Sequence, residues 1–182
     1  MSYASSPENA TRPLETAAGL LVTLQSAVPS PPRPSMTLRA GTLADLNELE
    51  ALELRAFAHD CIARRSFVRF LTSRNASVIV ADGGALCGYA LVMFRSRSKL
   101  ARLYSIAVDA ENAGHRLGSR LLDAAEDAAY RRGSKAMRLE VREDNMPATN
   151  LYQRFGYSLV GRISTYYDDG SHALRLQKLL EK

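Results

Sequence analysis

Residues 103–122 decide the fold of this chain, and they read LYSIAVDAENAGHRLGSRLL. The run begins with apolar, β-prone side chains and ends its first part at Asp109, which predicts a largely buried strand. The following turn contains Gly114 and Gly118 and leads directly into a segment with helical periodicity. Helix N-termini expose unpaired N–H groups and the positive end of the helix dipole. A strand, a turn and a helix in this order therefore predict a site for an anion such as a phosphate.

The segments that follow continue as a helix and a strand. Residues 116–132 predict the helix, and Gly133 is placed to end it. Its predicted inward face consists of Leu117, Leu121, Leu122, Ala125 and Ala128. Residues 136–142 alternate between apolar and charged side chains, which predicts a strand with one buried face.

The last part of the chain predicts one more helix and two strands. Asn145 is a suitable N-cap for a helix that runs to Phe155. Residues 157–163 and 173–180 predict a closing pair of strands. The link between them carries Tyr166, Tyr167, Asp168 and Asp169.

The segments before residue 103 predict a strand and two helices. Residues 36–39 alternate as a strand. Thr42 and Asp45 have the spacing of a capping box, and leucines at every third position from Leu43 to Leu52 follow them. A second helix is predicted over residues 60–72.

A hairpin is predicted after these helices. Residues 77–81 and 86–94 read as its strands, and Asp82-Gly83-Gly84 is a favourable turn between them. The next turn, residues 95–99, is very basic. It favours a solubilising turn over a site for an acidic partner or for the 3′-phosphate end of a nucleotide cofactor.

The composition is that of a globular protein with a basic domain. The chain has 182 residues and a net charge of +5, with 46% hydrophobic and 24% charged residues, so it can bury a core. Residues 1–35 contain six of the seven prolines and contribute none of the net charge. We therefore predict a Pro/Ser-rich, disordered tail over residues 1–35 and a folded domain over residues 36–182. The basic domain favours an anionic ligand or partner, and an ordinary solvated basic surface explains the charge equally well.

The cysteine content and the hydropathy of the chain indicate its expected cellular compartment. Cys61 and Cys87 have neither metal-site nor redox spacing, which predicts free thiols in a reducing cytoplasm and no metal cofactor. No apolar run approaches the length of a membrane span, so no membrane partner is expected.

Several of these segments together resemble the GNAT (GCN5-related) N-acetyltransferases, and within them the RimI type that acetylates protein N-termini. The resemblance covers roughly residues 36–180, and several motifs in the right order are more specific than any single motif. The motifs are Ile106-Ala107-Val108-Asp109, Leu117-Gly118, Leu139-Glu140-Val141-Arg142, Asn145-Met146-Pro147-Ala148, Leu151 to Tyr157, and Tyr166-Tyr167. The resemblance implies the α/β GNAT fold, with a mixed central sheet of about six or seven strands, a splayed pair of parallel strands and about four helices. It also implies that the first two helices form one wall of the substrate site.

The resemblance implies acetyl-coenzyme A as a co-substrate, with its pyrophosphate on the main-chain N–H groups of Gly114, His115, Arg116, Leu117, Gly118 and Ser119. The family pattern is roughly Arg/Gln-x-x-Gly-x-Gly/Ala. This chain departs from it, with Ala113 at the first position and Arg116 at the first glycine. An arginine side chain can crowd a phosphate that needs close backbone approach, and its guanidinium also suits a phosphate.

The thioester is expected beside the strand that contains Ile106, Ala107 and Val108. The resemblance implies a bulge and a splay there, with a main-chain N–H of Ile106 or Val108 pointing at the thioester carbonyl. A backbone donor in that position stabilises a developing oxyanion. Asn145 is expected to contact the pantetheine arm as well as to cap its helix.

Glu140 is the predicted general base, which acts on the amine directly or through water. The alternative is a solvated strand glutamate paired with Arg138 or Arg142, and such pairing suits a poor base. Tyr152 is the predicted general acid, which protonates the coenzyme A thiolate. Its alternative is a core aromatic side chain on an amphipathic helix.

The leading hypothesis is an enzyme that moves an acetyl group from acetyl-coenzyme A to a primary amine by direct attack in a ternary complex. A protein or peptide N-terminus, or a lysine, is the favoured acceptor. A small-molecule amine and a non-catalytic coenzyme A-binding module are the alternatives. The absence of tryptophan and of a recognised binding motif disfavours nucleic acid as a partner, and both a monomer and a homodimer stay open.

Overall fold

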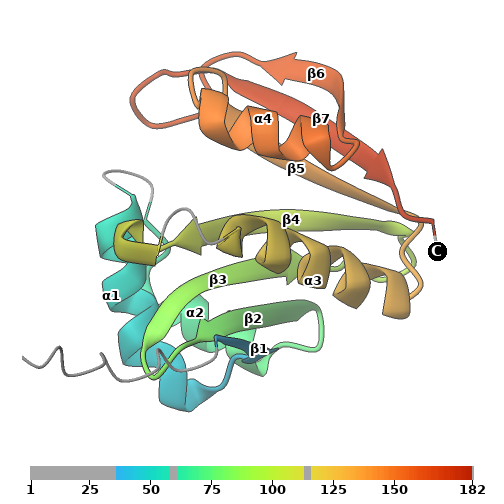
Figure 1. The fold of residues 1–182 in the computed structure, drawn as a ribbon. Coiled ribbons are helices and arrows are strands. Elements are labelled where there is room, and N and C mark those ends of the chain that lie inside the picture. The colour runs from blue at the N-terminus through green and yellow to red at the C-terminus, as the bar shows by residue number, and fades with distance from the viewer. Residues whose placement is uncertain (1–35, 58–60, 113–115, 182) are drawn as a thin grey trace, which may run out of the picture. The chain divides into compact units, whose positions relative to one another are not determined.

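The computed structural model describes residues 36–57, 61–112 and 116–181. The tail predicted over residues 1–35 lies outside these ranges. The described residues form a seven-stranded mixed sheet with strand order β1-β2-β3-β4-β5-β7-β6, together with four α-helices (Figure 1). The α/β prediction with about six or seven strands and about four helices is therefore confirmed.

The bounds of the elements agree with the predicted segments in most places. The strands are β1 Thr37–Ala40, β2 Ala76–Asp82, β3 Leu86–Met93, β4 Leu100–Val108, β5 Ala136–Arg142, β6 Ser158–Ile163 and β7 Ala173–Leu179. The helices are α1 Leu46–Ala56, α2 Arg64–Thr72, α3 Leu117–Arg131 and α4 Met146–Arg154, with short 3-10 turns at Leu43–Asp45 and Ala110–Asn112. Within the described residues, none of the helices is long and apolar enough to cross a membrane.

The parallel strands β4 and β5 pair over only part of their length. Their register runs from Leu100 opposite Ala136 to Leu103 opposite Leu139, and the pairing stops there. Every other neighbouring pair in the sheet is antiparallel. Beyond Leu103 the two strands diverge, as Figure 1 shows, and this is the splay that the resemblance implied.

A bulge in β4 lies at Tyr104, close to the point where pairing with β5 ends. Val92 of β3 lies opposite Leu103, whereas the preceding Leu91 lies opposite Ser105, so Tyr104 is the extra residue. Its ring contacts Phe70 of α2 at a centroid distance of 5.5 Å, and Ser105 bonds to Tyr89 on the same side of the sheet. The bulge therefore turns two successive side chains to one face and reverses the alternation of the residues after it.

Two apolar clusters cover the two faces of the sheet. One cluster contains α3 with residues of β3, β4 and β5, and the other contains α1 and α2 with residues of β2 and β3. On α3 the buried positions include Leu121, Leu122 and Ala125, as predicted. The prediction of Ala128 was wrong, since it is half-buried and Ala129 takes the buried position. A helix turns by 3.6 residues, so the stripe drifts by one position over its length.

The start of the first helix confirms the capping box. The Asp45 carboxylate accepts the main-chain N–H of Thr42 at 2.7 Å and also two bonds from the Arg39 guanidinium at 2.7 and 2.8 Å. Hydrogen bonding from Arg39 lowers the pKa of Asp45 to about 2. The second helix begins at Arg64, four residues later than predicted, because Ala63 is extended. The predicted start, residue 60, lies outside the described ranges.

Candidate active site

A cleft of about 700 Å³ opens where β4 and β5 diverge. Four parts of the chain line it: the C-terminal end of α1 with the segment after it, the splayed ends of β4 and β5, the helices α3 and α4, and the β6–β7 link. The lining residues include Glu53, Phe57, Ile62, Arg102, Ser105, Ile106, Val108, Gly118, Glu140, Asn145, Tyr152, Tyr166 and Tyr167. The cleft therefore brings together several candidates that are far apart in the sequence.

The main-chain N–H groups of Ile106 and Val108 face the open side of β4. The Asp109 N–H donates to the Cys87 carbonyl of β3 at 2.8 Å. Successive residues of a strand direct their N–H groups to opposite sides, so those of Ile106 and Val108 point away from β3. On that side β5 has already diverged. These donors lie at the cleft without a strand partner, where they can polarise a carbonyl group. The bulge lies two residues earlier, at Tyr104.

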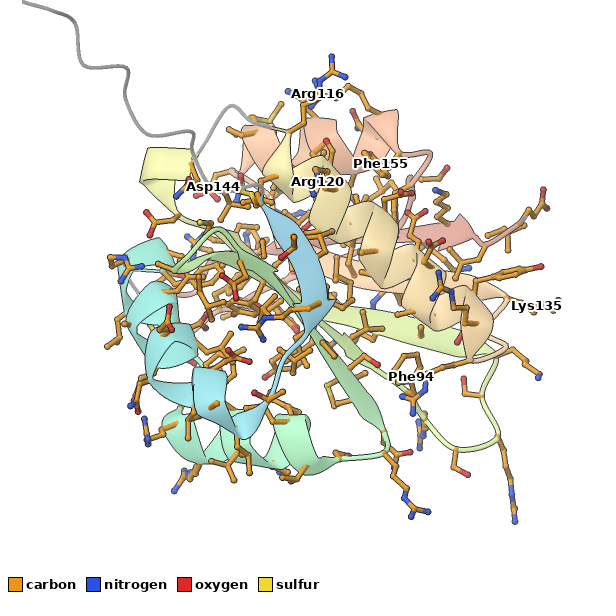
Figure 2. The ribbon with its side chains drawn as sticks, turned by 60° about the horizontal axis from the view of Figure 1, so that its bottom comes forward. Phe94, Arg116, Arg120, Lys135, Asp144 and Phe155 are labelled. Atoms are coloured by element: carbon orange, nitrogen blue, oxygen red, sulfur yellow. The ribbon has the colours of Figure 1, made fainter. Side chains whose placement is uncertain are left out.

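The N-terminus of α3 is a second group of donors. Among the described residues, the first helical bond runs from the Arg120 N–H to the Arg116 carbonyl at 3.0 Å, so the N–H groups of Leu117, Gly118 and Ser119 precede it. The N-cap residue, Arg116, makes no side-chain cap. Figure 2 shows Arg116 at the start of α3, before Arg120. The predicted Gly114 and His115, and the departure at Ala113, lie outside the described residues.

Arg116 adopts a left-handed backbone conformation, with φ 53° and ψ 22°. Glycine reaches this region without strain, whereas a residue with a Cβ pays a steric cost. Arg116 occupies a glycine position of the family pattern. A glycine there would adopt the left-handed conformation without the steric cost of a Cβ. At Gly118, the other glycine of the pattern, an added Cβ would lie 3.5 Å from the nearest Leu151 atom, which is an ordinary van der Waals contact.

Glu140 lies between two guanidinium groups on the polar face of β5. Its side chain is 6% exposed, and its oxygens lie 2.8 Å from Arg102 Nη2 and 2.9 Å from Arg175 Nε. The predicted alternative partners were wrong, because Arg138 donates to Gln177 and Arg142 pairs with acids of the following loops. The sheet register places Arg175 directly opposite Glu140. Residues two apart on one strand are separated by about 7 Å, which favours cross-strand partners.

Arg102 ties β4 to two other parts of the cleft. Besides Glu140, its Nη2 atom donates to the Tyr166 hydroxyl at 2.7 Å. Burial opposes the charge of Arg102, but Glu140 and Tyr166 outweigh it and raise the pKa of the guanidinium. Arg102 therefore stays charged and holds the β6–β7 link beside the splayed strands.

The β6–β7 link is fixed by Arg142. This side chain pairs with Asp169 at 2.9 Å and its guanidinium lies 4.9 Å from the centre of the Tyr167 ring. The Arg142 bond lowers the pKa of Asp169. Asp169 also accepts the Ser171 N–H, which is typical of an aspartate in a polar turn. Tyr167 lines the cleft.

Tyr152 is buried and lines the cleft at the same time. Its side chain is 5% exposed and packs edge-to-face on Tyr157 with a centroid distance of 5.8 Å. Burial, and to a lesser degree the neighbouring Tyr167, raises the pKa of Tyr152, so the phenol keeps its proton at neutral pH. Its helix is capped as predicted, since Asn145 Oδ1 accepts the Ala148 N–H at 3.1 Å. The two interpretations of Tyr152 are thus compatible, because its ring is part of the core and borders the cleft.

Glu53 of α1 is a cleft residue that sequence reasoning missed. It is 2% exposed and accepts the Ile62 N–H at 2.8 Å and the Tyr89 hydroxyl. Burial raises the pKa of Glu53, against the opposing effect of these two hydrogen bonds. A signal was available in the sequence, because Glu53 lies four residues after Leu49 on the apolar stripe of the helix. A lone acid on such a stripe marks a buried carboxylate.

A further prediction concerns the basic turn before β4. The basic turn at residues 95–99 precedes β4, at the end opposite to the cleft. This position does not support its alternative role as a site for the cofactor 3′-phosphate.

Cys61 and Cys87 are free thiols. No group of acidic, histidine or cysteine side chains suited to a metal ion occurs among the described residues.

Comparisons with known proteins agree with this geometry. The sequence profile of the acetyltransferase (GNAT) family matches residues 43–157. N-alpha-acetyltransferase RimI of Mycobacterium tuberculosis is 35% identical over 136 residues, which is 72% of this chain and 84% of that protein. Streptothricin acetyltransferase of Streptomyces lavendulae is 33% identical over 106 residues, and this match spans only 56% of either chain. Among solved structures, the ribosomal-protein-S18-alanine N-acetyltransferase of Escherichia coli has the same fold. Its TM-score is 0.73 at 24% identity, and the match covers 81% of this chain and 95% of that one.

Proposed function

The chain belongs to the GNAT family of acetyltransferases, and from that premise we propose that it transfers an acetyl group from acetyl-coenzyme A to a primary amine. The amine attacks the thioester directly while both substrates occupy the cleft. The observation that carries the proposal is the position of two main-chain donors, on Ile106 and Val108, in the same cleft as the buried phenol of Tyr152; neither donor has a strand partner among the described residues.

The start of α3 is the proposed site for the coenzyme A pyrophosphate. Among the described residues, the N–H groups of Leu117, Gly118 and Ser119 precede the first helical bond, which Arg120 donates, and Arg116 adds a guanidinium. Gly114 and His115 are proposed to add main-chain donors from the preceding turn. Ile106, Ala107 and Val108 would flank the thioester, and Asn145 would contact the pantetheine arm.

The proposed reaction forms a C–N bond and breaks the C–S bond. The N–H group of Ile106 or Val108 stabilises the negative charge that develops on the carbonyl oxygen. Tyr152 donates its proton to the departing thiolate. Burial keeps this phenol protonated and makes it a weaker acid. The thiolate leaves within the same buried cleft, where burial favours its neutral form in the same way.

Glu140 is proposed to accept a proton from the nitrogen as the C–N bond forms, directly or through water. Oε1 of Glu140 accepts a hydrogen bond from Arg175. Oε2 lies 2.8 Å from Arg102 in an ion pair and has no hydrogen-bond partner among the described residues, so this oxygen is the proposed site for the proton.

A protein or peptide N-terminus, or a lysine, is the acceptor that we favour. The supporting observations are the RimI relative at 35% identity and the two tyrosines of the β6–β7 link at the cleft. A small-molecule amine is the second candidate, and the streptothricin acetyltransferase match supports it. A non-catalytic coenzyme A-binding module is the third, because Arg116 occupies a pattern glycine in a strained conformation.

Binding and turnover of acetyl-coenzyme A test this function. Calorimetry is run with wild type and Arg116→Gly, and release of the free thiol is followed with a pool of peptides and a separate pool of small amines. We expect binding by wild type and thiol release with peptides, and a loss of release of about a hundredfold in Tyr152→Phe with binding retained. Binding without release on either pool would favour the non-catalytic module. No binding by either protein would contradict the proposal.

A further inference from the structure

Two carboxylates line the cleft among the described residues, and their surroundings differ. Glu140 is contacted by Arg102 and Arg175, so this group of three carries a net positive charge. An incoming ammonium would be repelled by that group. Glu53 lines the same cleft and, among the described residues, has no cationic partner within ion-pair distance. The charge distribution therefore directs a cationic acceptor to Glu53.

The hydrogen bonds of Glu53 come from neutral donors. The Ile62 N–H donates to Oε1 at 2.8 Å, and the Tyr89 hydroxyl donates to Oε2. Neutral donors orient a carboxylate without cancelling its charge, and a carboxylate has lone pairs for further donors. An ammonium ion can complete the set, because a buried carboxylate is stabilised strongly by an opposite charge.

Glu53 is connected to the strand that would hold the thioester. The Tyr89 hydroxyl lies 2.7 Å from Ser105 Oγ, and Ser105 directly precedes Ile106. Two hydrogen bonds thus separate the carboxylate from the residue next to the proposed carbonyl donor. Phe57 and Ile62 line the same part of the cleft and reduce its exposure to water.

We infer that Glu53 forms the acceptor subsite for a primary ammonium group and takes the first of the two protons that the nitrogen loses during acetylation. The inference rests on the proposed acetyl transfer. Loss of the first proton turns the ammonium into a nucleophilic amine. The C–N bond then forms, the second proton passes to Glu140, and the C–S bond breaks as Tyr152 protonates the sulfur. Glu140 returns its proton to Tyr152 through water, and the proton on Glu53 leaves to solvent with the product. No oxidant or reductant is needed.

The burial of Glu53 also supports its role as a base. It raises the pKa of Glu53 in spite of the bonds from Tyr89 and Ile62, so the carboxylate holds a proton more strongly than an exposed glutamate does. The sequence position of Glu53 on the apolar stripe of α1 places this base in the wall that faces β4.

The charge of the acceptor provides the test. The kcat/KM of Glu53→Gln is measured with a peptide whose N-terminus is an ammonium and with an alkoxyamine that is uncharged at neutral pH. We expect a loss of roughly 30- to 100-fold with the peptide and of less than about threefold with the alkoxyamine. Glu140→Gln is the matched control, and it should lower both rates by a similar factor.

Further variants separate charge from folding. Glu53→Asp keeps the charge and should keep the preference for the peptide, even if both rates fall. Tyr89→Phe removes the hydroxyl and keeps the carboxylate, so its loss with the peptide should be less than about fivefold. Calorimetric binding of acetyl-coenzyme A within about twofold of wild type confirms that each variant is folded.

Two results would overturn the inference. Equal losses with both acceptors in Glu53→Gln would assign the residue a structural role, and an unchanged rate with the peptide would exclude the subsite. A wild type that binds acetyl-coenzyme A but acetylates neither acceptor would instead contradict the proposed transfer itself, and the subsite with it.

Discussion

The sheet consists of a continuous half and a divided half, and they serve different purposes. In the continuous half, β1 to β4 pair antiparallel, and Val80, Tyr89 and Leu91 are fully buried beneath α1 and α2. In the divided half, β5 leaves β4 after one short paired stretch, and the outer strand β6 exposes Leu159 and Val160. Beside the divergence of β4 and β5, the polar side chain of Arg102 contacts those of Glu140 and Tyr166. The continuous half therefore contains most of the buried apolar side chains among the described residues, and the divided half contains the cleft of the proposed site.

The largest effect is expected from Gly88→Ala in the continuous half. A Cβ there would lie 2.8 Å from the Ala107 carbonyl oxygen and 2.9 Å from Leu121 Cδ1, so β3 would have to shift against β4 and α3. We expect a loss of about 3 kcal/mol in the free energy of unfolding, measured in urea. Gly161→Ala in β6 is the control, since no atom lies within 4 Å of its added Cβ. Similar losses at both glycines would remove the contrast between the halves.

The second prediction concerns pH and the Asp45–Arg39 pair at the start of α1. Hydrogen bonding from Arg39 lowers the pKa of Asp45 to about 2, below its unfolded value. The resulting stability is present above pH 4 and disappears as the pH falls toward 2. We expect Asp45→Asn to lose about 2 kcal/mol at pH 7 and much less at pH 2.5. A difference between the two proteins that does not change with pH would contradict the pKa shift.

The third prediction compares the two carboxylates of the cleft. Glu140→Gln leaves Arg102 and Arg175 without their shared acid, which should cost about 1 to 2 kcal/mol because both arginines are partly exposed. Glu53→Gln should stay within about 0.5 kcal/mol of wild type, since the amide keeps two hydrogen bonds and removes a buried charge. Urea unfolding at pH 7 measures both. A larger loss at Glu53 would show that its ionised form stabilises the fold.

The smallest effect is expected at the N-terminus of α3. Arg116→Gly relieves the left-handed strain at φ 53° and should raise the free energy of unfolding by about 0.5 to 1 kcal/mol, after the entropy cost of glycine. Arg116→Ala keeps the Cβ and should show no such gain. Thermal unfolding of both variants measures the difference. Equal midpoints for the two variants would indicate that the strain is absent.

Local patterns in the sequence were sufficient for most of the elements. The alternation over residues 136–142 and the cap at Asn145 are short-range properties, and both are confirmed. The run at residues 103–108 likewise forms a strand. Where periodicity alone was used, as for Ala128, the prediction was off by one position.

The partners of the charged side chains depended on tertiary structure. The alternative interpretation of Glu140 paired it with its neighbours in sequence, but its partners Arg102 and Arg175 come from other strands. Glu53 belongs to a helix more than fifty residues before Ile106, and only the bulge at Tyr104 turns Ser105 toward the Tyr89 hydroxyl that links them. No pattern within one segment contains such a register.

The sequence by itself thus determined the order of helices and strands, the start of α3 close to residue 116 and the family of the fold. These features depend on side-chain periodicity and on backbone preferences that act over a few residues. Only the tertiary structure decided which carboxylate is paired with arginine and which is held by neutral donors. That outcome depends on where β4 and β5 cease to pair, because charge and burial are set by contacts across strands and not by spacing along the chain.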